Sequence, residues 1–119
     1  MAGRDGILTP SLTAAQPAKG PPVAEKAGTL TIPADPTGAL SYVTDKATAK
    51  AGSVKFEMPN KSPIQHNIAI KGPATGAGPI VGSGGTSTFT ANLKPGTYVF
   101  FCQVPGHEAA GMKGTLTVK

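Results

Sequence analysis

The sequence predicts an all-β fold, a sandwich or barrel of about eight short strands. Short runs rich in Val, Ile, Thr, Tyr and Phe recur along the chain, and clusters of Gly, Pro, Asn and Asp separate them. The composition agrees, because the 119 residues include 16 glycines and 12 prolines, which suit many short strands and turns. A chain of this length has room for one hydrophobic core.

The predicted strands follow one another from residue 29 onward. We expect them at 29–32, 42–43, 46–50, 54–58, 66–70, 87–91, 97–102 and 114–118. Successive side chains of a strand point to opposite faces, so Val54, Phe56 and Met58 are expected to point inward, as are Leu116 and Val118.

The same alternation relates two chemically interesting side chains to the core. Cys102 shares a face with Phe100, and His66 shares a face with Ile68. Both are therefore expected at the inner face of a strand, at one end of it. Two segments that are distant in the sequence can meet in this way.

Residues 1–27 differ from the rest, because their Ala, Pro, Lys and Gly mixture has no helical or alternating period. We expect a flexible N-terminal arm or tether there and a single domain over 28–119. Alternatively, Ile7, Leu8 and Leu12 pack on the sandwich. No apolar run approaches the roughly 18 residues of a membrane span, and a signal peptide's hydrophobic segment is missing, so we expect the chain as given to be soluble.

A potential metal-binding motif lies near the end of the sequence. Cys102, His107 and Met112 follow one another with four residues between each pair. Copper suits this mixture of donors, because Cu(I) favours sulfur and Cu(II) favours nitrogen. His66 is the only other histidine in the sequence, and we expect it to be the fourth ligand.

Each of these residues also has an ordinary structural interpretation. Free cysteine often behaves as a small buried hydrophobe, methionine fills gaps in cores, and a lone histidine can be a hydrogen-bonded surface residue. The joint pattern favours a metal, since one cysteine and two histidines all stand where one site needs them. A copper chaperone, a Cys–His nucleophile and a structural zinc site remain alternatives, although methionine is a poor zinc ligand.

The stretch 98–118, with His66 and Asn67 upstream, resembles the cupredoxins, the small blue-copper electron carriers. It is most similar to the plastocyanin and auracyanin branch, with a longer gap between cysteine and histidine than plastocyanin has. The resemblance implies a Greek-key β-sandwich, no enzymatic activity, and one type 1 copper ion. The family's copper ligands correspond to His66, Cys102, His107 and Met112, and the two histidines are expected to bind through Nδ1.

The resemblance also implies supporting and docking residues. Asn67 is expected to hydrogen-bond toward the Cys102 loop, and Gln65 to support the ligands beside it. Electrons are expected to pass through His107, to redox proteins that dock on the small apolar residues around it. These residues are Val104, Pro105, Ala109, Ala110 and Gly111.

The charge of the chain narrows the class of partner. The formal net charge is +5, which favours acidic redox partners. Nucleic acid is not expected, because the sequence has no basic run with interleaved aromatics and no Trp. We expect a monomer, and the resemblance implies an extracytoplasmic location, in the periplasm or at the outer face of the cell membrane, with a membrane tether possible outside this sequence.

Overall fold

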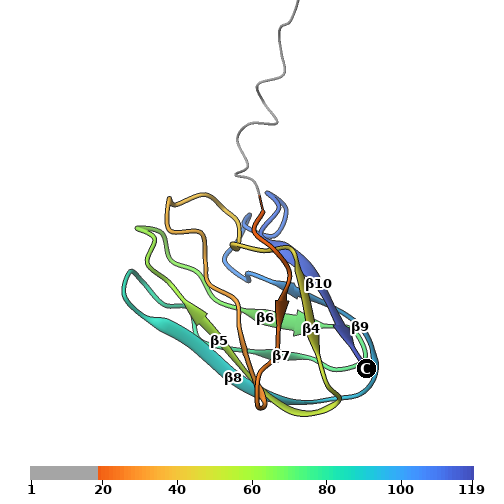
Figure 1. Cartoon of the computed structure of the whole chain (residues 1–119). Coiled ribbons are helices and arrows are strands. Elements are labelled where there is room, and N and C mark those ends of the chain that lie inside the picture. Colours follow the sequence, from red (N-terminus) through yellow and green to blue (C-terminus); the bar gives the residue numbers. More distant parts are fainter. Residues whose placement is uncertain (1–18) are drawn as a thin grey trace, which may run out of the picture.

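The computed structural model describes residues 19–119, and within this range the chain folds into nine strands without a helix. The strands are β2 (Val23–Ala24), β3 (Thr29–Thr31), β4 (Lys46–Ala49), β5 (Gly52–Pro59), β6 (Ala69–Lys71), β7 (Gly76–Ala77), β8 (Thr86–Leu93), β9 (Gly96–Phe101) and β10 (Lys113–Val118). One sheet has the order β2-β4-β10-β9-β6-β7, and the other has the order β3-β5-β8. Figure 1 shows β5 and β8 on one side of the molecule and β10 and β9 on the other. The predicted all-β sandwich is confirmed.

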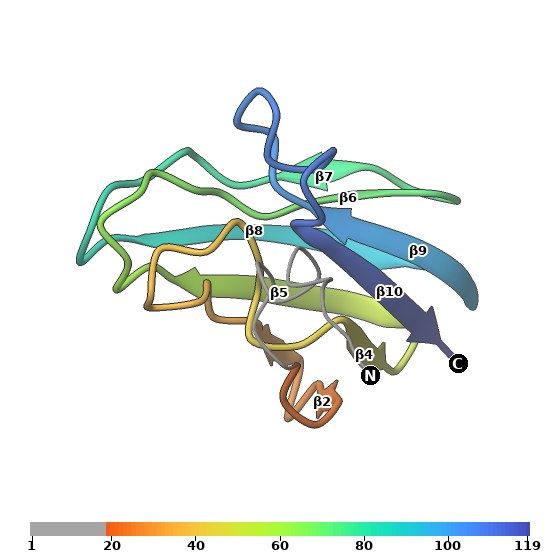
Figure 2. The same ribbon diagram turned by 90° about the horizontal axis from the view of Figure 1, so that it is seen from above.

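The register of the larger sheet brings the ends of three strands together. β9 runs antiparallel to both β6 and β10, so that Phe101 lies opposite Ala69 on one side and Lys113 on the other. Cys102 directly follows Phe101, which places it beside the residues that precede β6 and β10. The loop between β9 and β10 projects beyond the strand ends (Figure 2).

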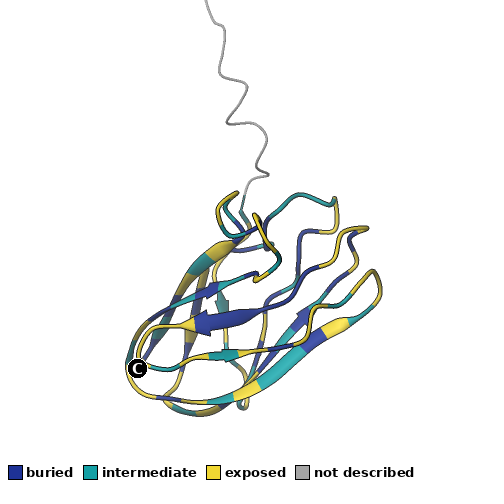
Figure 3. Ribbon diagram, turned by 180° about the vertical axis from the view of Figure 1, so that it is seen from behind, coloured by how far each residue is buried: buried dark blue, intermediate teal, exposed yellow. Residues whose placement is uncertain are grey.

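The core lies between the two sheets and follows the predicted alternation. On β5, Val54, Phe56 and Met58 are buried, and on β10, Leu116 and Val118 are buried. Fully burying one such side chain stabilises the fold by about 1.5–3 kcal/mol. In Figure 3 the buried residues follow the strands, and many of the exposed ones lie in the connecting loops.

Two predicted strands are wrong in extent. In the strand expected at 42–43, Tyr42 forms only an isolated bridge with Ala34. The strand expected at 66–70 begins at Ala69. Before Ala69, His66 makes an isolated bridge with Val81. The side chain of Asn67 hydrogen-bonds to the Gly78 carbonyl and the Gln103 N–H, main-chain groups that a strand ladder would otherwise pair. Alternation alone does not detect such a short pairing, because both faces of this segment are buried.

Two strands were not predicted. β7 lies within a glycine-rich segment that reads as a loop, and it pairs with β6. Gly76 in β7 faces the ring of Phe89, and an added Cβ would lie 2.7 Å from that ring. The absence of a side chain therefore allows the strand to lie close to β8, so here glycine marks close packing and not a turn.

The other unpredicted strand, β2, belongs to the segment expected as an arm. Residues 1–18 of that segment lie outside the described residues. Val23 and Ala24 pair in parallel with Ala47 and Thr48 of β4, so the described end of the segment lies against the larger sheet. In the described part of the chain, no helix is long and apolar enough to cross a membrane.

Candidate metal centre

His66 is held by main-chain pairing on a segment outside the regular strands. Its N–H donates to the Val81 carbonyl at 3.1 Å, and the Val81 N–H donates back at 2.9 Å. The Asn60 side chain donates to the carbonyls of Ile64 and Val81, which fixes the chain just before the histidine. The imidazole is completely buried.

Cys102 and His107 lie at opposite ends of a tight turn that follows β9. The His107 N–H donates to the Val104 carbonyl at 3.0 Å, and Gly106 takes a φ of 85°, which a glycine adopts without strain. The turn closes on itself, because the Cys102 N–H donates to the Met112 carbonyl at 3.1 Å. A turn at Gly106 thus carries the chain from Cys102 to His107.

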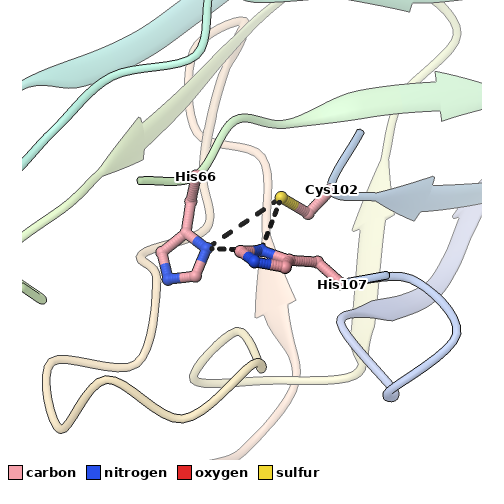
Figure 4. Close-up of side chains that lie close together, drawn as sticks. All are labelled: His66, Cys102 and His107. Carbon is pink, nitrogen blue, oxygen red and sulfur yellow. Dashed lines mark hydrogen bonds between the residues drawn. The ribbon is translucent and has the colours of Figure 1, made fainter. Parts of the chain in front are cut away.

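The three side chains converge on one point from two segments (Figure 4). The two Nδ1 atoms of His66 and His107 are 3.2 Å apart. The Cys102 sulfur lies 3.9 Å from Nδ1 of His66 and 3.5 Å from Nδ1 of His107. Both histidines thus direct the nitrogen that the resemblance implied toward the thiol.

These separations fit one metal ion. With metal–nitrogen and metal–sulfur distances of about 2.0 and 2.3 Å, a trigonal arrangement places two nitrogens about 3.5 Å apart and a nitrogen about 3.7 Å from the sulfur. The observed 3.2, 3.5 and 3.9 Å lie close to these values. Two imidazole nitrogens that face each other at this distance need either a shared proton or a shared metal, and the thiol beside them favours the metal.

The environment keeps the imidazoles in the state that binds metals. Burial, and then the neighbouring His107, lower the pKa of His66 from 6.5 to about 4. Burial also lowers the pKa of His107. Both rings are therefore held neutral, and a neutral ring offers its Nδ1 lone pair.

The thiol behaves in the opposite way. Burial raises the pKa of Cys102, although main-chain hydrogen bonds from Asn67 and Val104 act to lower it. The thiol stays protonated in the absence of a metal, so metal binding must release its proton. The main-chain N–H groups of Asn67 and Val104 favour the ionised sulfur and would stabilise the thiolate that forms.

The sequence profile of copper-binding proteins of the plastocyanin/azurin family matches residues 31–119. This match covers more than half of the chain. The chain belongs to the plastocyanin/azurin family.

Individual relatives agree with this assignment. Rusticyanin of Acidithiobacillus ferrooxidans is 36% identical over 100 residues, which cover 80% of this chain and 63% of that protein. Plastocyanin of Dryopteris crassirhizoma is 33% identical over 100 residues, covering 71% of this chain and 94% of the plastocyanin. The crystal structure of reduced auracyanin from Roseiflexus castenholzii superposes with a TM-score of 0.68 at 28% identity, covering 86% of this chain and 99% of that one. This plastocyanin/azurin protein therefore spans less than two thirds of the rusticyanin that it matches.

The cofactor of the family is copper, and the donor set in this member fits one copper ion. The thiol and two imidazoles are the ligands of the trigonal plane in a blue-copper site. Met112 is also buried, and its N–H donates to the His107 carbonyl at 3.0 Å. The main chain of Met112 is thus tied to both Cys102 and His107.

Asn67 joins the two ligand-bearing segments of this family member. Its side-chain oxygen accepts from the Gln103 N–H at 2.7 Å, and its amide donates to the Gln103 side chain at 2.9 Å and to the Gly78 carbonyl at 3.0 Å. Gln65 is exposed beside His66, and the amide that pairs with Asn67 is Gln103. The position of Gln103 directly after Cys102 is the signal in the sequence that could have identified Gln103 as a supporting residue.

The residues around His107 that the sequence suggested as a docking surface are exposed to different degrees. Pro105, Ala109 and Ala110 are exposed, and Val104 and Gly111 are half-buried. Glu108 interrupts this group in the sequence. Its carboxylate pairs with Lys71 at 2.5 Å, and the Lys71 ammonium also lies 4.5 Å from the centre of the Phe101 ring.

Proposed function

We propose that the protein carries single electrons on one type 1 copper ion held by His66, Cys102, His107 and Met112. The observation that supports this proposal most directly is the triangle of two Nδ1 atoms and one sulfur, with sides of 3.2, 3.5 and 3.9 Å. Copper supplies a one-electron couple, and a donor set of nitrogen and sulfur serves both of its oxidation states. The protein is accordingly a carrier and not an enzyme.

The chain holds these donors in a nearly fixed geometry. His66 is paired with Val81, and the turn from Cys102 to Met112 is closed by main-chain hydrogen bonds. Asn67 then ties the two segments together through Gln103. A site that changes little between oxidation states transfers electrons with little reorganisation, which is what a carrier needs.

Met112 has the role of the weak axial ligand in this proposal. Its side chain is completely buried, and its main chain is tied to the two ligands that precede it. Methionine sulfur is a soft donor that suits Cu(I) and contributes little to zinc binding. Its presence therefore favours copper over a structural zinc.

Electrons enter and leave through His107. His107 is 9% exposed, whereas Cys102 is 1% exposed and His66 and Met112 are fully buried. The docking patch around it consists of Val104, Pro105, Ala109, Ala110 and Gly111. The ion pair of Glu108 with Lys71 offsets the negative charge next to this patch. A small, nearly neutral surface suits brief encounters.

The partners are redox proteins with acidic surfaces. Besides the net charge of +5, a shallow groove on the outer face of the larger sheet is lined by Lys46, Lys71 and Lys113, together with Asp45 and Glu108. We place the protein outside the cytoplasm, as a monomer that a tether outside this sequence can hold at a membrane.

The same three residues would also suit a nucleophilic cysteine. Cys102 lies 3.5 Å from His107, the spacing of a thiol and its base. However, the thiol is 1% exposed, and burial raises its pKa, whereas reactive cysteines are accessible and have a lowered pKa. The same burial makes rapid metal exchange with a partner difficult, which argues against a copper chaperone.

Adding Cu(II) to the apoprotein tests the proposal. An intense visible band from thiolate-to-copper charge transfer is expected with one equivalent of copper, and Zn(II) should produce none. The variant Cys102→Ser should fold and lack the band. A folded wild-type protein that binds Cu(II) without this band would contradict the proposed site.

A further inference from the structure

Tyr42 touches the copper site from a direction that the ligand motif does not reveal. Its hydroxyl donates to the main-chain carbonyl of Asn67 at 2.7 Å, and both residues are buried. The Tyr42 ring packs on Phe100, with centroids 5.4 Å apart. Phe100 lies two residues before Cys102, so the ring and the hydroxyl hold the two ligand-bearing segments at once.

The position of Tyr42 is itself fixed. The Val43 N–H donates to the Pro33 carbonyl at 3.0 Å, and Tyr42 forms a bridge with Ala34. Burial raises the pKa of Tyr42 far above its ordinary value, and the neighbouring Cys102 acts in the same direction. The hydroxyl therefore remains a protonated donor under all ordinary conditions.

The peptide that Tyr42 contacts is held from its other side as well. The N–H of Ile68, which belongs to the same peptide as the Asn67 carbonyl, donates to the Ser87 hydroxyl at 3.4 Å. The Ser87 hydroxyl in turn donates to the Pro79 carbonyl at 2.6 Å. A buried chain of hydrogen bonds thus runs from Tyr42 through this peptide to Ser87 and fixes the peptide's orientation.

The orientation of Asn67 matters because it directly follows the ligand His66 and its side chain holds the Gln103 main chain beside Cys102. Its main-chain N–H also favours the ionised form of the Cys102 sulfur, since it lowers the pKa of that thiol. A donor aimed at a thiolate withdraws electron density from the sulfur and stabilises the reduced, less positive copper. We propose that Tyr42 is a positioning residue of the copper site, which fixes the Asn67 main chain beside Cys102 and thereby raises the reduction potential. This role rests on the proposed copper site.

The chain offers a matched control for the test. Its two tyrosines are Tyr42 and Tyr98, and each is 1% exposed. The Tyr98 hydroxyl also bonds to main chain, accepting from the Lys94 N–H at 3.0 Å and donating to the Lys94 carbonyl at 2.9 Å. Lys94 precedes β9, whereas Cys102 follows it, so Tyr98 bonds at the opposite end of this strand. Tyr98→Phe and Tyr42→Phe each remove one buried hydroxyl.

The reduction potential and the position of the charge-transfer band are measured for both copper-loaded variants. Tyr42→Phe is expected to lower the potential and to move the band to longer wavelength, because the sulfur regains electron density. Tyr98→Phe is expected to lose stability and to leave both quantities at their wild-type values. Unchanged values in Tyr42→Phe, or equal shifts in both variants, would overturn the role of Tyr42.

A second variant covers the case in which Tyr42→Phe does not fold. Ser87→Ala removes the hydrogen bond on the other side of the same peptide, and a smaller shift in the same direction is expected. In the diamagnetic Cu(I) form, the Asn67 amide proton should also exchange with solvent faster than in the wild-type protein. An unchanged potential and amide exchange in Ser87→Ala would overturn the proposal. Absence of the band in the wild-type protein would instead overturn the copper assignment, and the tyrosine's role with it.

Discussion

Asn67 shows how one side chain can determine the geometry of a site without contributing a ligand atom to it. Its carboxamide forms two hydrogen bonds with Gln103 and one with the Gly78 carbonyl. Asn67 is completely buried, so water does not reach its carboxamide, whereas Gln103 is exposed. A buried donor or acceptor left unpaired costs about 1–3 kcal/mol. Asn67 therefore holds the His66 segment and the Cys102 turn at a fixed separation.

A double-mutant cycle tests this link between residues. Asn67→Ala is expected to lower the free energy of unfolding by more than Gln103→Ala, because it also leaves the Gly78 carbonyl unpaired. The two changes share one hydrogen bond, from the Asn67 amide to the side-chain oxygen of Gln103, so their effects should be less than additive, with a coupling of about 0.5–3 kcal/mol. Urea unfolding of the apoproteins measures this coupling. Strict additivity would mean that the side-chain hydrogen bond between Asn67 and Gln103 contributes nothing to the link between the two segments.

Met112→Leu tests the axial role of the thioether. The replacement conserves volume, so the cost to stability is expected to stay below about 1.5 kcal/mol. The thiolate band should remain, because Cys102, His66 and His107 are intact. Although the thioether is a soft donor, the electron density it donates stabilises the more positive Cu(II) more than Cu(I), so its loss should raise the reduction potential, which redox titration measures. A potential equal to that of the wild-type protein would show that Met112 is only a core residue.

At the scale of elements, residues 60–65 form a hydrogen-bonded segment directly before His66. This segment, called the strap below, fixes the position of the histidine. The Asn60 side chain donates to the carbonyls of Ile64 and Val81, and its oxygen accepts from the N–H and the hydroxyl of Ser62. His66 pairs with the same Val81. The strap and Val81 thus hold His66 in place, although this ligand does not lie on a regular strand.

Replacing Asn60, which makes these hydrogen bonds, should loosen His66. Asn60→Ala is expected to lower the free energy of unfolding by at least about 1–3 kcal/mol, since several main-chain groups lose their partner. Copper should also be released to a chelator faster than from the wild-type protein. Asn92→Ala, at an exposed position on β8, is the matched control and should change neither quantity. Equal release rates in the two variants would contradict the role of the strap.

What sequence patterns predict about these elements depends on how each is stabilised. β5, β9 and β10 were predicted from alternation, because one face of each packs on the core. β7 was missed, since its glycine serves close packing against Phe89 and carries no apolar pattern. The copper ligands could be predicted from residue chemistry and spacing. Gln103 could have been considered, because it directly follows Cys102. Tyr42 could not, because it acts through Asn67, 25 residues further along the chain, and such a contact exists only in three dimensions.

At the scale of the whole molecule, burial of the copper site makes the stability of the apoprotein depend on pH. The pKa of His66 is about 4 in the folded chain, against an ordinary value of 6.5. Between these values the unfolded chain binds more protons than the folded one, so stability must fall as pH decreases from about 6.5 to 4. Burial of His107 acts in the same direction.

Urea unfolding of the apoprotein at several values between pH 7 and pH 4 measures this dependence. The midpoint is expected to decrease steadily across the range, and His66→Gln should reduce the slope because the buried titrating group is gone. The copper-loaded protein should release its metal only as the pH approaches 4, where protons begin to compete for Nδ1 of His66. A midpoint independent of pH would mean that His66 is accessible to solvent in the folded apoprotein.

The net charge of +5 should control how fast the protein exchanges electrons. An anionic oxidant such as ferricyanide is attracted, so its rate should fall as salt shortens the Debye length from about 30 Å at 0.01 M to about 8 Å at 0.15 M. A cationic cobalt complex should show the opposite trend. Stopped-flow bleaching of the copper band measures both rates.

Two lysine variants show whether charge near the copper end dominates. In that case Lys113→Gln should weaken the salt dependence for ferricyanide more than Lys94→Gln does. Lys94 lies before β9, at the strand end away from Cys102, so its replacement makes the same change of charge far from the copper. Equal effects would show that net charge alone steers the encounter, and a rate independent of salt would contradict steering altogether.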